Sequence, residues 1–282
     1  MAVLFWLTSF SAAASNAASL DIPKSISSSL ERNQIPKDAI SISVIEIEPG
    51  RPGRHIAKNI LGWRSEVLMN PASTMKLLTT LSGLDILGPQ YRWRTNIYTD
   101  GMIRQGVLKG NLYLQGTGDP KLIPEELAKM MKDLQNLGIQ KIDGNLFFDR
   151  SAYAPSVMEH NTIDGESLRA YNVPPDPLLY AFRTLSFQLG KSRTADFIDI
   201  NYTPALSQLK VVNQMQLVDR PCDNWKSNID FKLDPEGISN TDQALTAQFS
   251  GAFPSSCKGV NFNIVALDAN TFLTQGFAAA WE

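Results

Sequence analysis

Histidine is almost absent from this chain. Only two histidines, His55 and His160, occur among 282 residues, and they lie far apart in the sequence. A serine–histidine–aspartate triad needs an imidazole beside the nucleophile, and most zinc sites use histidine or cysteine ligands at short, regular spacings. The chain shows neither arrangement, so we expect no metal and no cofactor.

The chain also lacks an excess of either charge. Its 26 lysines and arginines balance 28 aspartates and glutamates, which gives a net charge of −2. No basic block or arginine-rich arm is present, so a nucleic-acid partner is not expected. Hydrophobic residues make up 43% of the chain, a content typical of globular proteins and high enough to form a sizeable core.

Cysteine is scarce as well, with Cys222 and Cys257 the only two. In an exported protein such a pair indicates a disulfide. Closing a loop of this length would stabilise the fold by roughly 4 kcal/mol in the chain-entropy account. The alternative is two buried free thiols.

The N-terminus has the composition of a secretory signal peptide. Residues 2–14 are apolar or small, and small residues follow at a position that suits cleavage after Ala17. The usual positive start is missing, because the first basic residue is Lys24. We therefore predict a signal peptide over residues 1–17 and an exported, periplasmic protein, with a buried first strand or helix as the alternative. The stretch is too short to span a bilayer, and no other segment suits one.

The most informative stretch is Ser73-Thr74-Met75-Lys76. On a helix, a serine and a lysine three residues apart share one face, about one turn apart. The amine can then take the proton of the hydroxyl, so the pair can act as nucleophile and base without histidine. The alternative is an ordinary exposed helix start, since the pattern is short.

The flanking residues favour a helix that begins abruptly at Ser73. Pro71 biases the residue before it away from the helical region, and Gly88-Pro89 ends the pattern. Apolar residues recur at helical spacing, which predicts a buried helix. They are Leu77, Leu78, Leu81, Leu84 and Leu87.

The remaining patterns predict an α/β (α+β) fold. Helices are expected over 25–33, from Pro124 to Gly138, and over 271–282 with Asn270 as the cap. Alternation and turn residues predict strands in the intervening segments. These are 40–47, 55–60, 92–98, 107–114, 140–149, 186–201, 206–218, 228–233, 243–249 and 260–267, those from 186 to 249 being antiparallel.

Ser-x-x-Lys is one of the signatures of penicillin-binding proteins. Together with the segments named below, it makes the chain resemble the D-alanyl-D-alanine carboxypeptidases/endopeptidases of penicillin-binding-protein 4 type. The resemblance runs from about Ile40 to the end. The segments that carry it, in the order of that family, are 70–76, 87–89, 106–112, 118–120 and 142–145, together with Pro174-Pro175 and the two cysteines.

The resemblance implies roles for two residues. Ser73 would be the nucleophile that forms an acyl-enzyme with the stem peptides of peptidoglycan or with β-lactams. Lys76 would be its general base, and the Ser73 backbone N–H would be one oxyanion donor.

It also implies a domain organisation, in which a penicillin-binding transpeptidase-like domain carries a large, mostly-β insertion. Residues 18–91 would be the front part of that catalytic domain, 92–259 the inserted region, and 260–282 a return to the catalytic domain.

The chain departs from the resemblance in one respect. The family uses two further motifs, Ser-x-Asn and Lys-Thr-Gly, and neither occurs in these 282 residues. The nearest approach, Lys191-Ser192-Arg193, falls within the insertion. We therefore expect the front part of a C-terminally truncated enzyme of peptidoglycan metabolism, inactive as this chain. The alternatives are a non-catalytic periplasmic protein that binds peptidoglycan or a partner, and a β-lactamase, against which the long insertion argues.

Overall fold

The computed structural model describes residues 21–48, 56–158, 162, 164–166, 168–194, 196–236, 244–265 and 267–282. The expected signal peptide and both histidines lie outside the described residues. The chain divides into two compact units, Met1–Gln90 and Tyr91–Glu282, and each is considered by itself below. The second unit begins at Tyr91, where the sequence changes from a helical to a strand-like pattern.

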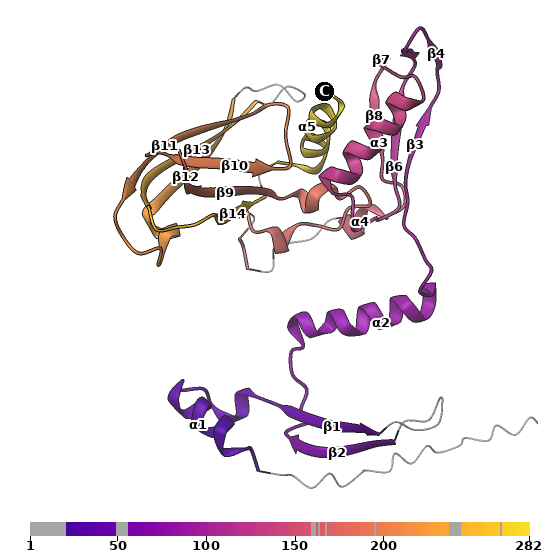
Figure 1. The fold of residues 1–282 in the computed structure, drawn as a ribbon. Coiled ribbons are helices and arrows are strands. Elements are labelled where there is room, and N and C mark those ends of the chain that lie inside the picture. Colours follow the sequence, from indigo (N-terminus) through magenta and orange to yellow (C-terminus); the bar gives the residue numbers. More distant parts are fainter. Residues whose placement is uncertain are drawn as a thin grey trace, which may run out of the picture. The chain divides into compact units, whose positions relative to one another are not determined.

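The described residues of the first unit form two α-helices, two short 3-10 helices and a two-stranded antiparallel sheet (Figure 1). The register of this hairpin shifts between Val44 and Ile45. The predicted first helix is confirmed, and its Leu30 is buried. In chain order the elements are α1 (Lys24–Arg32), η1 (Lys37–Ala39), β1 (Ile42–Glu48), β2 (Ile56–Trp63), η2 (Ala72–Thr74) and α2 (Met75–Leu87).

Helix α2 forms where the sequence predicts it, but the expectation that it is buried is wrong. No residue of α2 is buried, and the exposed fractions of Leu77 and Leu81 are 76% and 65%. Helical spacing of leucines shows only that a helix has an apolar side to bury. Within the described residues of the first unit, no element covers that side.

The second unit begins with small strands and one helix. The strands form two three-stranded sheets, ordered β3-β6-β8 and β4-β5-β7. The elements are β3 (Thr95–Thr99), β4 (Met102–Arg104), β5 (Val107–Lys109), β6 (Leu112–Gly116), α3 (Pro124–Asn136), β7 (Lys141–Asp143) and β8 (Leu146–Asp149).

Two segments predicted as single strands, 107–114 and 140–149, are each broken into two. The breaks come at Gly110 and Gly144, where the two backbones touch. A Cβ atom on Gly144 would lie 2.1 Å from the carbonyl oxygen of Gly110, so only glycine permits this approach. Strands β5 and β7 form one parallel pair, and β6 and β8, which follow them after the bends at Gly110 and Gly144, form the next.

Helix α3 has the amphipathic pattern that its sequence predicts. It begins with Pro124 at its first turn. Leu127, Met131 and Leu134 lie at helical spacing and are buried in the same core as Leu112 of β6.

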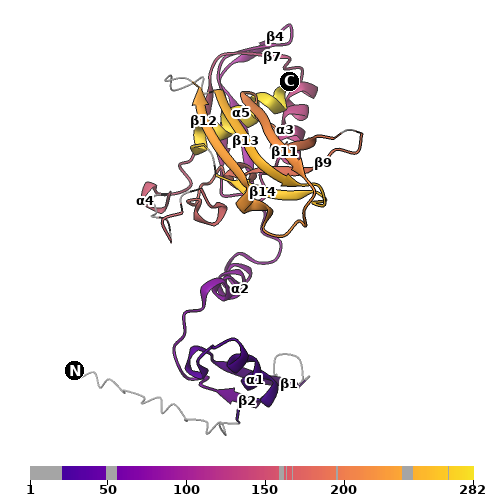
Figure 2. The same ribbon diagram turned by 90° about the vertical axis from the view of Figure 1, so that its left-hand side faces the viewer.

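The rest of the second unit is built on two more three-stranded sheets, ordered β10-β9-β14 and β11-β13-β12. Figure 2 shows β13 between β12 and β11. Phe187 of β9 lies 5.0 Å from Phe249 of β13, measured between ring centroids, so the two sheets share an aromatic core. The strands are β9 (Leu185–Lys191), β10 (Ile198–Thr203), β11 (Leu209–Val218), β12 (Ile229–Glu236), β13 (Ala244–Pro254) and β14 (Val260–Ile264).

One predicted pairing is wrong. Strands β11 and β13 are parallel neighbours, not antiparallel ones. Strand β12 lies between them in the sequence but pairs antiparallel with the far edge of β13. Because β12 reverses the chain once and β13 reverses it again, β11 and β13 run in the same direction.

Helix α5 (Ala269–Trp281) closes the described chain. Asp268 caps it, because its carboxylate accepts hydrogen bonds from the backbone N–H groups of Asn270 and Thr271. The predicted cap, Asn270, is therefore two positions too late. Gly276 packs against the ring of Tyr180, and a Cβ atom there would lie 2.3 Å from Cε1 of that ring.

Residues 260–282 make their contacts within the second unit. Strand β14 pairs with β9, and α5 packs against α3. The return of this segment to the catalytic domain stays a prediction. Within the part of the chain that the structure describes, no helix has the length and apolarity required to cross a bilayer.

Candidate active site

The turn before Ser73 is fixed by local hydrogen bonds. The Asn70 side-chain oxygen accepts a hydrogen bond of 2.9 Å from the backbone N–H of Ala72. Ala72 has a φ of +43°, a left-handed conformation that non-glycine residues rarely adopt. Thr74 donates both its backbone N–H and its hydroxyl to the carbonyl of Pro71. The chain thus turns sharply at Ala72, the first residue of η2, and Ser73 follows directly.

Ser73 lies in the short helix η2, which runs directly into α2. The side-chain nitrogen of Lys76 donates a hydrogen bond of 3.0 Å to the Ser73 hydroxyl oxygen. Both residues are exposed. The two candidate site residues are therefore brought together as the sequence predicts, on one side of the helix and open to solvent.

The electrostatics of this helix start suit a developing negative charge. No acidic residue lies in the first turn of α2. The unpaired N–H groups of a helix N-terminus carry partial positive charge, which stabilises an anion by about 0.3–1 kcal/mol at an exposed site. A serine held next to an amine at such a position can be deprotonated and can attack a carbonyl carbon.

Lys191-Ser192-Arg193, the nearest approach to Lys-Thr-Gly, lies in the second unit at the end of β9. The Lys191 side chain forms an ion pair of 2.9 Å with Asp196. This hydrogen bond lowers the pKa of the Asp196 carboxyl. The lysine is thus engaged by an aspartate in its own loop, and the segment gives no support for a substrate-binding Lys-Thr-Gly motif.

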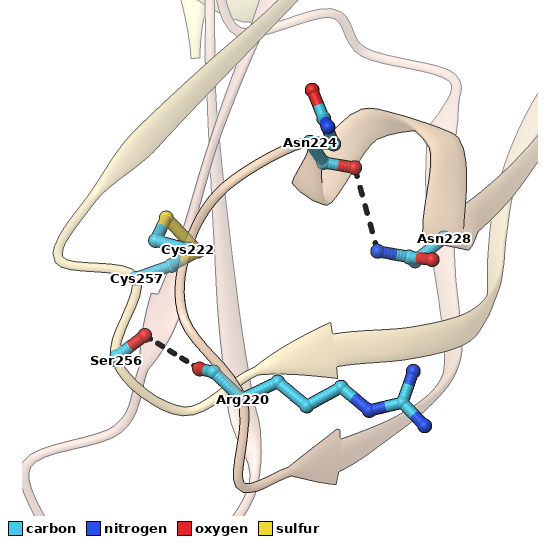
Figure 3. The surroundings of a disulfide bond; sticks show 6 residues. All are labelled: Arg220, Cys222, Asn224, Asn228, Ser256 and Cys257. Atoms are coloured by element: carbon cyan, nitrogen blue, oxygen red, sulfur yellow. Dashed lines mark hydrogen bonds between the residues drawn. A yellow bond between two sulfur atoms is a disulfide. The ribbon is translucent and has the colours of Figure 1, made fainter.

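The two cysteines form a disulfide, Cys222–Cys257, which links the segments that follow the parallel strands β11 and β13 (Figure 3). Cys257 is buried, with 1% of its surface exposed. Beside the bond, the Ser256 hydroxyl donates a hydrogen bond of 2.7 Å to the Arg220 carbonyl (Figure 3). The alternative of two free thiols is thereby excluded for this structure.

A second group of polar residues surrounds Arg150, and no pattern in the sequence predicted it. Arg150 contacts Asp176 and Asn270, which lie 26 and 120 residues further along the chain. No short motif joins positions so far apart, and only the fold brings them together.

Comparison with known proteins agrees with these features. The D-Ala-D-Ala carboxypeptidase 3 (S13) family matches residues 23–282. The chain belongs to this family of serine-type D-Ala-D-Ala carboxypeptidases, and the resemblance found in the sequence is confirmed.

Two relatives carry the name D-alanyl-D-alanine carboxypeptidase. The chain is 28% identical over 171 residues to DacB of Haemophilus influenzae, an alignment that covers 58% of this chain and 36% of the relative. It is 35% identical over 80 residues to the enzyme of Actinomadura sp. strain R39, which covers 28% of this chain and 15% of that enzyme.

The fold is similar to that of a solved structure, penicillin-binding protein 4 (dacB) of Haemophilus influenzae. The TM-score is 0.56 at 21% identity, with 86% of this chain and 50% of that chain covered. The same protein in complex with a β-lactam gives a TM-score of 0.50 at 19% identity, with 85% and 48% covered. The chain thus spans about half the length of that structure, and the mixed α/β fold class is confirmed.

Proposed function

We propose that the protein acts in peptidoglycan metabolism as a serine D-alanyl-D-alanine carboxypeptidase/endopeptidase, with Ser73 as the nucleophile and Lys76 as the general base. The observation that carries this proposal is the 3.0 Å contact between Lys76 Nζ and Ser73 Oγ. This distance lies within the range over which a positioned base takes a proton from a nucleophile.

The proposed reaction is acyl transfer. Ser73 Oγ attacks the carbonyl carbon of the penultimate D-alanine while Lys76 Nζ takes the hydroxyl proton. The C–N bond then breaks, and the terminal D-alanine leaves as an amine that carries a proton. Water hydrolyses the resulting ester and frees Ser73. The Ser73 backbone N–H would be one donor to the oxyanion.

We propose peptidoglycan stem peptides as substrates, β-lactams as acylating inhibitors, and an exported, periplasmic location. The apolar segment at the N-terminus supports export. The disulfide also supports export, because disulfides persist in oxidising compartments.

The 282 residues carry one of the three motifs that the resemblance implies. Loss of one oxyanion donor slows acyl transfer by roughly 10²–10³-fold. Loss of an acid/base relay slows it by roughly another 10²–10⁴-fold. We therefore propose that the 282-residue polypeptide by itself is inactive on a biological timescale.

One observation favours a second candidate function, a non-catalytic protein that binds peptidoglycan or a partner. Neither η2 nor α2, the two segments that carry the dyad, has a buried residue, so the described residues of the first unit form no wall around Ser73. Under this alternative, binding depends on the second unit and is independent of Ser73.

A labelling experiment separates the two candidates. The 282-residue protein is incubated with a fluorescent penicillin beside its Ser73→Ala variant. We expect slow labelling that depends on Ser73. Absence of label on the folded protein, together with retention on purified sacculi that does not depend on Ser73, would overturn the proposed enzyme and favour the binding protein.

A further inference from the structure

The second unit contains a pocket with a volume of about 330 Å³. Its polar wall comes from three separate segments: the residue after β8, the loop around Asp176 and Arg183, and the start of α5. Its apolar wall includes Pro174 and Pro175. A mixed wall of this kind is typical of sites for small ligands, in which a few polar groups fix the orientation of an apolar body.

Arg150 is held rigidly in this wall. Its Nε donates to both carboxylate oxygens of Asp176 at 2.9 Å, and its Nη1 donates to the Asn270 side-chain oxygen at 2.7 Å. The guanidinium also lies 5.4 Å from the centroid of the Phe148 ring. Only 15% of the Arg150 side chain is exposed. Its remaining nitrogen, Nη2, is buried and has no hydrogen-bond partner among the described residues.

Arg183 reaches the same pocket from an unusual backbone. It is the last of three consecutive residues with left-handed φ values: Ala181 at +44°, Phe182 at +54° and Arg183 at +49°. Such conformations are costly for non-glycine residues and are concentrated at functional sites. Arg183 Nε is buried and, within the described chain, has no hydrogen-bond partner.

The nearby carboxylates do not use these donors. Asp176 accepts from Arg150 Nε and from the backbone N–H of Leu178, and Asp268 accepts from the first backbone N–H groups of α5. Burial lowers the pKa of the Arg183 guanidinium, whereas Asp268 and Asp176 raise it. The formal charges of the two arginines and two aspartates in the pocket wall cancel. Two donors, Arg150 Nη2 and Arg183 Nε, are nevertheless left without an acceptor among the described residues.

We propose that this pocket binds a small ligand through its carboxylate, which accepts hydrogen bonds from Arg183 Nε and Arg150 Nη2. A planar carboxylate matches the geometry of guanidinium donors, and charge-assisted hydrogen bonds of this type are strong. A doubly charged phosphate suits the pocket less well, because Asp176 and Asp268 border it. The apolar part of the ligand would contact Pro174 and Pro175. The site lies in the second unit and does not depend on acyl transfer at Ser73.

The test is a titration of the Ser73→Ala protein, in which acyl transfer cannot contribute. The probes are N-acetyl-D-alanyl-D-alanine, its C-terminal carboxamide and inorganic phosphate. We expect the free carboxylate to bind and to shift the ¹⁵N-detected Arg183 Nε–H signal. We expect the carboxamide to bind at least about tenfold more weakly, since it loses a charge-assisted hydrogen bond.

Two further variants complete the test. Arg183→Gln should weaken binding of the free carboxylate by at least about tenfold. Arg104→Gln removes an exposed arginine of β4 outside the pocket and should leave the affinity unchanged. Equal affinity for carboxylate and carboxamide, equal affinity for phosphate, an unaffected Arg183→Gln variant, or no binding would each overturn the proposal. The Nε–H shift is measured with both arginines intact, so the test survives if Arg183→Gln does not fold.

Discussion

The amine of Lys76 lies 3.0 Å from the hydroxyl oxygen of Ser73, across one turn at the start of an exposed helix. The contact is local, because both residues belong to one continuous helical segment. It therefore forms without any contribution from the rest of the fold. The substrate walls and the second oxyanion donor, in contrast, must come from elsewhere in a serine acyl-transfer site.

The exposure of α2 predicts that its leucines contribute little to the stability of this polypeptide. Leu77→Gln and Leu81→Gln should each change the free energy of unfolding by no more than about 0.5 kcal/mol, as is usual for surface positions. If these leucines were buried, truncating one of them would lower the free energy of unfolding by about 2–5 kcal/mol.

The measurement is urea denaturation of the 282-residue polypeptide, with Leu127→Gln as the matched control. Leu127 lies on α3 and is completely buried. The control should lose several-fold more stability than either α2 variant. An equal loss at Leu77 and Leu127 would show that α2 packs against something.

Gly276→Ala should destabilise the second unit. Alanine favours a helix over glycine by about 1 kcal/mol, which would stabilise α5. However, the new Cβ atom would lie 2.3 Å from the Tyr180 ring, and that ring is itself buried. Overpacking of this kind costs about 1–3 kcal/mol, so the clash outweighs the propensity.

Thermal unfolding measures this effect. Gly83→Ala in α2 is the control, because nothing lies within 4 Å of the added Cβ atom there. We expect Gly276→Ala to lower Tm and Gly83→Ala to leave it unchanged or raise it. A rise in Tm for Gly276→Ala would contradict the packing of Tyr180 on α5.

Asp268 should make the stability of the second unit sensitive to acid. Burial raises the pKa of this carboxyl, but hydrogen bonds from Thr271 and Asn270 outweigh burial, and the pKa lies below its ordinary value. A group whose pKa is lowered in the folded state stabilises fully above its unfolded pKa of about 3.9 and loses that contribution as pH falls through the folded pKa.

The test compares wild type with Asp268→Asn, which keeps a capping oxygen but does not titrate. We expect wild type to be more stable by about 0.3–1 kcal/mol near neutral pH, because a charged cap also interacts with the helix dipole. The difference should vanish below the folded pKa of Asp268. A difference that is constant from neutral to strongly acidic pH would disprove the role of this charge.

Removal of the disulfide should weaken the second unit. The bond closes a loop with a sequence separation of 35 residues. In the chain-entropy account, a disulfide that closes such a loop raises the free energy of unfolding by roughly 4 kcal/mol. The Cys222→Ala/Cys257→Ala double variant should therefore show a lower urea midpoint than the oxidised wild type.

Reduction of the wild-type protein should lower the midpoint by a similar amount and should leave the double variant unaffected. If a reductant lowered the midpoint of both proteins equally, the loss could not be assigned to this bond.

The sequence predicted the features that depend on neighbouring residues. The starts of α2 and α3 followed from proline and from apolar spacing, and the Ser73–Lys76 contact followed from helical geometry. The features that it missed depend on residues far apart in the chain. The approach of Gly110 to Gly144 splits two predicted strands, and the burial of a helix depends on a partner that local spacing does not reveal.

The pocket around Arg150 shows the same limit. The arginine, the aspartate and the asparagine that meet there come from three segments with no common motif. The parallel pairing of β11 with β13 was also out of reach, because alternation along a strand does not specify its neighbour. The candidate dyad was therefore predictable from the sequence, whereas the pocket around Arg150 was not.

The most direct test of the proposed pair is the rate at which benzylpenicillin acylates the 282-residue protein, followed by intact mass and assigned by peptide mapping. We predict one adduct, on the peptide that contains Ser73, formed about 10²–10⁴-fold more slowly in Lys76→Met, because the general base is lost. Thr79→Ala, which changes an exposed hydroxyl on the same helix, should not affect the rate. An adduct that persists in Ser73→Ala, or a rate that is unchanged in Lys76→Met, would contradict the proposed pair.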